Sequence, residues 1–143
     1  MNRKIVADSS SDNHGLRTVD FSVAPMMIHT TKKAYLDDSD LNVDEMVEDL
    51  LKNKEKTSSA CPGLWDWLNA FGDAQEVFVL TITSKLSGSY NSACLARDEY
   101  LEQHPDRKVY VCDTLSTGPE MQLLAEKIAE LTAEGADFDT VCK

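Results

Sequence analysis

Hydroxyl side chains are gathered in four short polar segments of this sequence. Three segments directly follow stretches typical of buried strands, and the fourth comes just before a short helical pattern. They occupy residues 8–11, 83–89, 113–118 and 57–59. Serine and threonine hydroxyls donate and accept hydrogen bonds without carrying a charge. Together with free backbone N–H groups, they predict a binding site for a small anion such as a carboxylate or a phosphate.

The segment Ser87-Gly88-Ser89 carries the most specific signal, because a helix is expected to begin there. The first N–H groups of a helix have no partner within it, and the positive end of the helix favours an anion. Gly88 lets a ligand approach the backbone closely, while Ser87 and Ser89 can donate hydroxyl hydrogen bonds. An alternative is that Ser87 only caps the helix and Gly88 only forms a turn. These three residues leave both interpretations open, and the other hydroxyl segments favour binding.

Catalytic signatures are weak elsewhere in the chain. The pattern Gly-x-Ser-x-Gly of a hydrolase nucleophile and the phosphate loop of nucleoside triphosphatases are both absent. Three histidines stand apart from any recognisable Ser or Cys partner, and we expect them in loops or at the surface: His14, His29 and His104. Cys61 could act as a nucleophile, but no base accompanies it, so a structural thiol is the better interpretation.

Two further groups of residues have both a functional and a structural interpretation. Three carboxylates could bind a metal, although solvated or capping roles are commoner for loop residues of this kind. They are Asp8, Asp12 and Asp113. Four apolar residues could wall a ligand slot, although positions in the core or at a domain contact explain them more simply. They are Leu64, Trp65, Trp67 and Phe71. We therefore predict no metal site and no cofactor.

Alternating strand and helix patterns must position the hydroxyl segments. Strands are predicted at residues 4–7, 76–82 and 108–112, with a less regular extended stretch at 21–29 in which Pro25 argues for an edge. Helices are predicted at residues 42–53, 62–71, 87–103 and 117–134. This alternation predicts an α/β fold with a mostly parallel sheet and helices on both faces. Ligands bind at the carboxyl ends of such strands, where three of the hydroxyl segments should meet.

The overall composition limits the possible partners. With 143 residues, 42% of them hydrophobic and 27% charged, the chain has the make-up of one folded domain. The net charge of -11, with no run of Lys or Arg longer than two, argues against a nucleic-acid partner and against an anionic membrane surface. No apolar stretch is long enough to span a bilayer, so stable membrane insertion is not expected.

The four cysteines are scattered without metal-ligand spacing, and we expect no signal peptide because residues 1–6 run directly into a strand pattern. These features predict a reducing location, the cytoplasm. Residues 136–141 resemble the start of another helix, which stops at residue 143. Because a domain rarely finishes on a newly begun element, we expect residues 1–143 to be the N-terminal domain of a longer protein. A C-terminal domain would then be absent from this chain.

The hydroxyl segments resemble four motifs of the DegV family. Residues 4–12 resemble its opening pattern I-x-x-D-S-[ST]-x-D, and residues 56–63 resemble T-S-Q-P-S-P. Residues 82–93 are close to I-S-S-x-L-S-G-T-Y-Q-S-A, and residues 111–118 match V-x-D-S-x-x-x-S-x-G more loosely. The order and spacing of the motifs are kept across essentially the whole chain, and the third motif is specific.

The resemblance implies a fatty-acid carrier and not an enzyme. Members of the family hold one long-chain fatty acid between an N-terminal α/β domain and a C-terminal domain. Its carboxylate is bound by residues that correspond here to Thr57 and Ser87. Such proteins serve as the lipid-binding subunit of bacterial fatty acid kinase and present the carboxylate to the catalytic subunit for phosphorylation. The expected ligand-binding residues are Thr57, Ser58, Ser87, Gly88, Ser89, Ser9, Ser10 and Asp8.

Three positions depart from the family pattern. Ala60 replaces a proline and Cys61 replaces a serine, which predicts a less rigid loop, and Ser59 stands in place of a glutamine. Two other functions are alternatives. One is an α/β enzyme acting on a small phosphorylated or carboxylated metabolite, with Asp8 or Asp113 as its acid or base. The other is a protein-interaction module with an exposed apolar patch.

Overall fold

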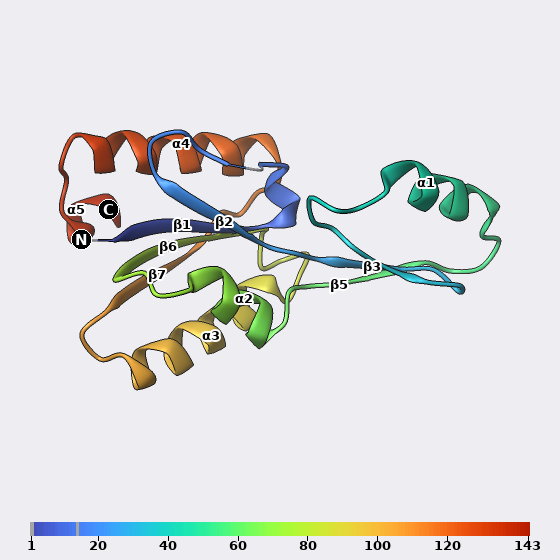
Figure 1. The fold of residues 1–143 in the computed structure, drawn as a ribbon, viewed down its shortest axis with the longest axis horizontal. Coiled ribbons are helices and arrows are strands. Elements are labelled where there is room, and N and C mark those ends of the chain that lie inside the picture. Colours follow the sequence, from blue (N-terminus) through green and yellow to red (C-terminus); the bar gives the residue numbers. More distant parts are fainter. Residues whose placement is uncertain (1, 14) are drawn as a thin grey trace.

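A four-stranded parallel sheet forms the centre of the larger part of the molecule in the computed structural model, which describes residues 2–13 and 15–143 (Figure 1). Its strands are β1 (Arg3–Asp8), β2 (Asp20–Ala24), β6 (Glu76–Thr81) and β7 (Lys108–Asp113). They lie in the order β2-β1-β6-β7, and each neighbouring pair is parallel. All six residues of β6 are buried, as a near-continuous apolar run requires when helices cover both faces of a sheet.

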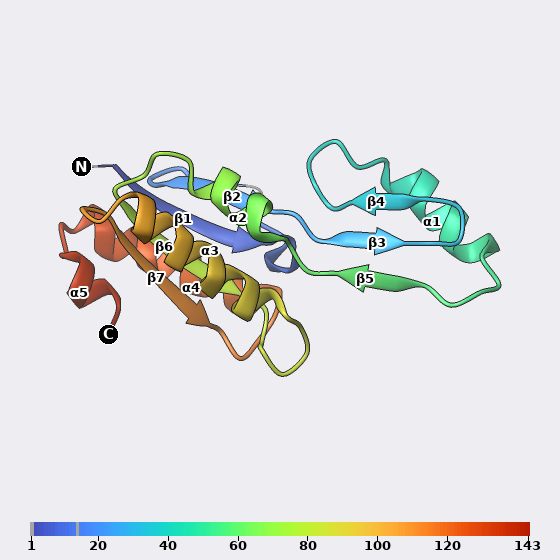
Figure 2. The same cartoon turned by 90° about the horizontal axis from the view of Figure 1, so that it is seen from below.

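Helices cover both faces of this sheet, which confirms the predicted α/β fold. The helices α2 (Leu64–Phe71) and α3 (Ser89–Gln103) lie on one face, and α4 (Pro119–Ala133) lies on the other (Figures 1 and 2). The first layer buries Trp67 and Phe71 completely, and the second buries Met121. The short helix α5 (Phe138–Val141) stacks Phe138 on Phe78 of β6, with 4.9 Å between the ring centroids.

The predicted elements of the main sheet and its helices agree with the structure to within about two residues at most ends. The helix α1 (Val43–Lys52) begins after Asn42, whose side chain accepts a hydrogen bond from the N–H of Glu45 at 3.1 Å. The helix predicted to start at Ser87 begins at Ser89 instead, with Gly88 at its N-cap position. None of the helices formed by the described residues has the length and apolar character needed to cross a bilayer.

The stretch predicted at residues 21–29 is extended and its first part is an edge strand, as Pro25 indicated, but the prediction of one continuous stretch is wrong. The chain divides at Pro25 and Met26, so that β2 joins the main sheet while β3 (Met27–His29) enters a second sheet. This second sheet is antiparallel and adds β4 (Ala34–Leu36) and β5 (Ser58–Ala60), in the order β4-β3-β5. Strands of only three residues give too short a pattern for sequence periodicity to detect.

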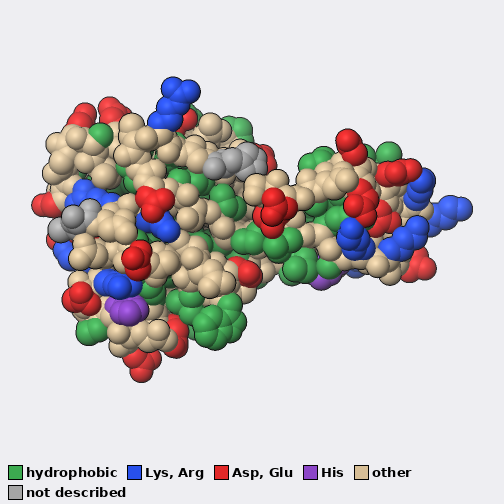
Figure 3. Space-filling view, viewed as in Figure 1, with side chains coloured by type: hydrophobic (Ala, Val, Ile, Leu, Met, Phe, Trp, Pro, Cys, Tyr) green, Lys and Arg blue, Asp and Glu red, His purple; other side chains and the backbone are tan. Residues whose placement is uncertain are grey.

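Residues 27–60, which we call the arm, project from one end of the main sheet, and α1 lies against the small sheet (Figures 1 and 2). A space-filling view shows that the arm is joined to the larger part through a narrower waist and that its outer end carries side chains of both charges (Figure 3). None of the residues of α1 is buried. Polar contacts must therefore contribute much of the interaction that holds α1 against the small sheet.

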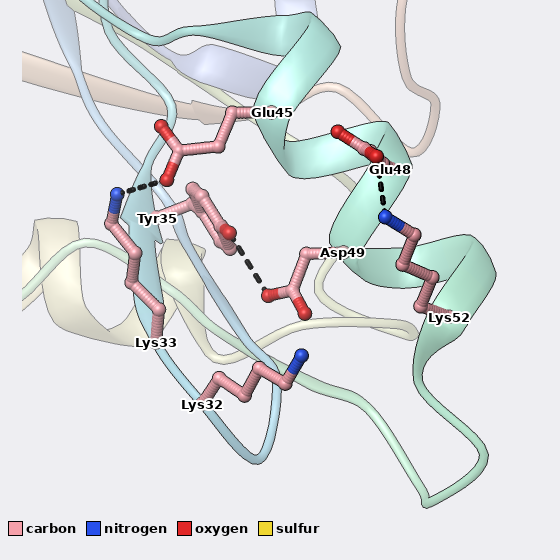
Figure 4. A pocket seen from close by; sticks show the side chains of 7 residues that line it. All are labelled: Lys32, Lys33, Tyr35, Glu45, Glu48, Asp49 and Lys52. Atoms are coloured by element: carbon pink, nitrogen blue, oxygen red, sulfur yellow. Dashed lines mark hydrogen bonds and ion pairs between the residues drawn. The ribbon is translucent and has the colours of Figure 1, made fainter.

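Those contacts centre on the carboxylate of Asp49 (Figure 4). It accepts hydrogen bonds from the Tyr35 hydroxyl at 2.9 Å and from the Thr30 hydroxyl at 2.7 Å, and Lys33 pairs with Glu45 at 2.7 Å. The bonds from Thr30 and Tyr35 hold the pKa of Asp49 below its usual 3.8. Burial and the bond to Asp49 raise the pKa of Tyr35 to about 12. The ionised carboxylate and the neutral phenol stabilise each other.

We expect α1 to detach from the small sheet at a higher pH than that at which the main sheet unfolds. The lowered pKa of Asp49 means that its stabilising contribution is complete above pH 3.8 and is lost as the pH falls through the lowered value. Amide signals of α1 in NMR spectra should therefore change before those of β6 during an acid titration. Asp49→Asn should loosen α1 already at neutral pH and remove this sensitivity, whereas Asp44→Asn should not. Simultaneous loss of both sets of signals would contradict the expectation.

Candidate functional site

Three of the four hydroxyl segments meet at the carboxyl edge of the main sheet, as predicted. Backbone hydrogen bonds join them in pairs, from the N–H of Gly118 to the carbonyl of Ser10 at 3.0 Å and from the N–H of Thr83 to the carbonyl of Ser116 at 2.9 Å. The loops after β1, β6 and β7 therefore form one connected surface.

Asp8 lies at the centre of this surface and is fully buried. Its Oδ1 accepts from the N–H of Ser10 at 3.2 Å and from the hydroxyl of the same residue. Its Oδ2 accepts from the N–H of Ile82 at 2.8 Å and from the Ser89 hydroxyl at 2.7 Å. Hydrogen bonds of this kind offset the cost of burying a carboxylate. Asp8 and Ser89 are thus bonded to each other inside the protein and are not exposed to solvent.

Ser87 and Gly88 line a hollow of about 430 Å³ beside this network. The Ser87 Oγ accepts from the N–H of Ser89 at 3.2 Å, so its own proton is free to be donated into the hollow. Gly88 has no side chain to cap α3, and a Cβ built on it would lie 3.6 Å from the Cys61 Sγ. The capping alternative therefore holds in part, because Ser87 does satisfy one N–H of the helix. Ser87 is only the acceptor in that bond, so its hydroxyl can still donate to a ligand.

Part of the lining of the hollow comes from the base of the arm, where Ser59 and Ala60 lie. Its lining residues besides Ser87 and Gly88 are Met26, Ser59, Ala60, Cys61, Ile82 and Leu86. Ser59 and Leu86 belong to the predicted hydroxyl segments, whereas the sequence did not place Met26, Ala60 or Ile82 at the site.

The predicted contacts Thr57 and Ser58 are exposed, and neither belongs to the lining of this hollow. Ser58 lies opposite His29 of β3, and Ser59 lies opposite Ile28, so their side chains leave β5 on different faces. Thr57 comes one residue before β5 and two before Ser59. A ligand contact for Thr57 or Ser58 stays a prediction.

Ser9 and Ser10 support the frame around the hollow. The Ser9 Oγ accepts from the N–H of Met26 at 3.0 Å, which ties the loop after β1 to the start of the arm. Ser10 donates to Asp8 and accepts from Gly118, as described above. Neither serine lines the hollow, so a direct contact with a ligand stays a prediction for both.

The remaining candidates lie apart from the hollow. Asp113 accepts from the N–H groups of Ser84 and Leu115, each at 3.1 Å, and the hydrogen bonds from Ser84 hold its pKa below the usual 3.8. No group of three or more metal-ligating side chains occurs in the part of the chain that the structure describes. His104 packs edge-on against Tyr100, and His14 lies outside the described residues.

The apolar candidates of α2 divide into two pairs. Trp67 and Phe71 are completely buried in the core, as predicted. Trp65 is 74% exposed and Leu64 is 37% exposed, so these two are available for a contact with another chain segment or partner.

The DegV family model, whose description reads "Uncharacterised protein, DegV family", matches residues 2–143. The chain belongs to the DegV family. A DegV domain-containing protein of Streptococcus pneumoniae is 43% identical over 145 residues, which cover 99% of this chain and 52% of that protein. The chain thus spans about half the length of the curated DegV relatives it matches.

Two solved DegV structures are closely similar. One is a DegV family protein from Eubacterium eligens loaded with heptadecanoic acid, with a TM-score of 0.96 and 43% identity over 98% of this chain and 51% of that one. The other is the Streptococcus pneumoniae fatty acid kinase B3 protein loaded with linoleic acid, with a TM-score of 0.95 and 43% identity over 99% of this chain and 52% of that one.

Removing the Asp113 side chain should lower the free energy of unfolding by about 1–2 kcal/mol at pH 7, because the Ser84 and Leu115 N–H groups lose their acceptor. Asp113→Asn keeps one acceptor oxygen and should cost less than Asp113→Ala. The lowered pKa means that the advantage of the parent over Asp113→Ala shrinks as the pH falls below 3.8. Urea unfolding followed by circular dichroism measures both effects. An unchanged difference at pH 3 would contradict this role.

Proposed function

We propose that this protein binds one long-chain fatty acid without transforming it and presents the carboxylate to a fatty acid kinase. The observation that carries the proposal is the hollow that the Ser87 hydroxyl and the start of α3 at Gly88 line together with Ser59. This is a place for a small anion, in a chain whose fold closely matches proteins loaded with heptadecanoic and linoleic acid.

The chemistry of the lining suits a carboxylate that must later react. Neutral hydroxyl and amide groups orient a carboxylate by hydrogen bonds without forming an ion pair. No Lys or Arg is among the described residues that line the hollow. A carboxylate held in this way keeps more of its nucleophilicity toward a phosphoryl group than one held in a salt bridge. Thr57, two residues from Ser59, supplies a further hydroxyl in our proposal.

The acyl chain would supply most of the affinity. Burying a methylene group contributes about 0.8 kcal/mol, so a long tail outweighs the head-group contacts. Apolar side chains adjoin Ser87 on the hollow's wall: Met26 and Ile82 are half-buried and Leu86 is 78% exposed. The relatives are about twice as long as this chain, and we propose that their remaining half completes the channel for the tail.

The proposed partner is the catalytic subunit of a fatty acid kinase. One closely similar structure is itself described as a fatty acid kinase B3 protein, which supports this assignment. The cysteines Cys61, Cys94, Cys112 and Cys142 are all free, which fits a reducing cytoplasm. A carrier of this kind needs no general acid or base, and the burial of Asp8 within four hydrogen bonds accords with that.

Lipid extraction and mass spectrometry of the protein at its full natural length test the proposal. We expect about one equivalent of fatty acid per protein from material purified from bacteria. Ser87→Ala should weaken binding roughly tenfold, which corresponds to about 1.4 kcal/mol for one hydrogen bond to a charged group. Ser84→Ala is the matched control, because this exposed serine belongs to the same loop but not to the hollow's lining. Well-folded protein without fatty acid would refute the proposal.

Gly88→Ala should weaken binding while leaving the fold intact. The φ angle of Gly88 is -76°, which alanine adopts without strain, and the new Cβ would lie 3.6 Å from the Cys61 Sγ, an ordinary contact. The methyl group would nevertheless occupy space beside the first N–H groups of α3. We expect at least a fivefold loss in a fluorescent fatty-acid displacement assay, with an unchanged melting temperature. Unchanged affinity would place the carboxylate elsewhere.

A further inference from the structure

Both ends of the loop that carries Ser87 and Gly88 are bonded to one oxygen atom. The Oδ2 of Asp8 accepts from the N–H of Ile82, where the loop leaves β6, and from the hydroxyl of Ser89, where it enters α3. The distances are 2.8 Å and 2.7 Å, and the donors are 74 and 81 residues away from Asp8 in the sequence. A single side chain from another strand thus closes the loop of residues 83–88.

The same contact continues to the hollow through Ser89. While the Ser89 hydroxyl donates to Asp8, its backbone N–H donates to the Ser87 Oγ at 3.2 Å. This bond occupies one acceptor lone pair of Ser87, so the Ser87 proton is directed away from the Ser89 N–H and is available to another acceptor. The hollow is the open side of Ser87. The position of Ser89 therefore limits the directions in which Ser87 can donate.

Asp8 has a strong physical reason to keep these donors in place. The ion pairs among the described residues do not include it, so its charge is balanced by N–H and O–H donors. A fully buried carboxylate that loses a donor is left with a large desolvation cost. Its other oxygen is bonded to Ser10, whose carbonyl accepts from Gly118 at the start of α4, so the anchor itself is fixed.

We propose that Asp8 is a positioning residue for head-group binding, which acts through Ser89 on Ser87 and does not touch the ligand. This inference rests on the proposed function, since it assumes that Ser87 binds the carboxylate. The competing interpretation is that Asp8 only stabilises the fold. Replacing Asp8 itself tests this poorly, because the loss of a buried charge with four donors affects folding and positioning together.

Two serines that donate to the same carboxylate provide a matched pair. Ser89→Ala and Ser10→Ala each remove one hydroxyl from Asp8, but Ser89 alone adjoins the Ser87 loop. We expect Ser89→Ala to raise the dissociation constant for a fatty acid about tenfold and Ser10→Ala less than threefold, at similar melting temperatures. Ser89→Thr keeps a hydroxyl at this position and should restore affinity to within about threefold of the parent.

Hydrogen exchange of the ligand-free protein gives a readout that does not depend on fatty acid. The N–H of Leu86 donates to the carbonyl of Thr83 at 3.1 Å inside the loop, and Ser89→Ala should make it exchange at least fivefold faster, unlike Ser10→Ala. If the parent binds no fatty acid, the proposed function fails while loop exchange still tests the role of Asp8. Equal effects of the two variants on exchange and on affinity would overturn the positioning role.

Discussion

A buried carboxylate must be surrounded by donors, and the site of this protein is arranged around that requirement at Asp8. The donors come from the loop after β1, from the end of β6 and from the start of α3. None of these segments would hold its position by local preference alone, because each is a polar loop at a strand end. Their common attachment to one buried group joins the loop after β1 to both ends of the loop between β6 and α3, and Ser87 and Gly88 lie in that second loop.

The hollow lies between the main sheet and the arm, and these two parts of the molecule are stabilised by different interactions. One wall belongs to the main sheet, whose strands and helices bury large apolar side chains. The other wall belongs to the base of the arm. The arm consists of three strands of three residues each and the helix α1, which has no buried residues. Small sheets of this kind have little stability of their own, so contacts such as the hydrogen bond from the Met26 N–H to Ser9 help to hold the arm to the main sheet.

The neutral donors of the proposed site are compatible with anion binding by a strongly acidic protein. A net charge of -11 disfavours anions at long range, yet hydroxyl protons and helix N–H groups act within hydrogen-bond distance. Such neutral donors orient a carboxylate more than they attract it. Affinity must then come from elsewhere, which suits a ligand with a long apolar tail better than a small charged metabolite.

The sequence by itself determined the α/β class, the strands and helices of the main sheet and the gathering of hydroxyl loops at one edge. These features follow from local periodicity and from the motif at residues 82–93. Tertiary structure alone decided that β3 and β5 form an arm, that Ser59 and not Ser58 lines the hollow, and that Asp8 and Ser89 bond to each other instead of facing solvent. The physical reason is that these outcomes depend on hydrogen bonds between residues up to 81 positions apart. No local sequence pattern shows which of several neighbouring hydroxyl groups will form such a hydrogen bond.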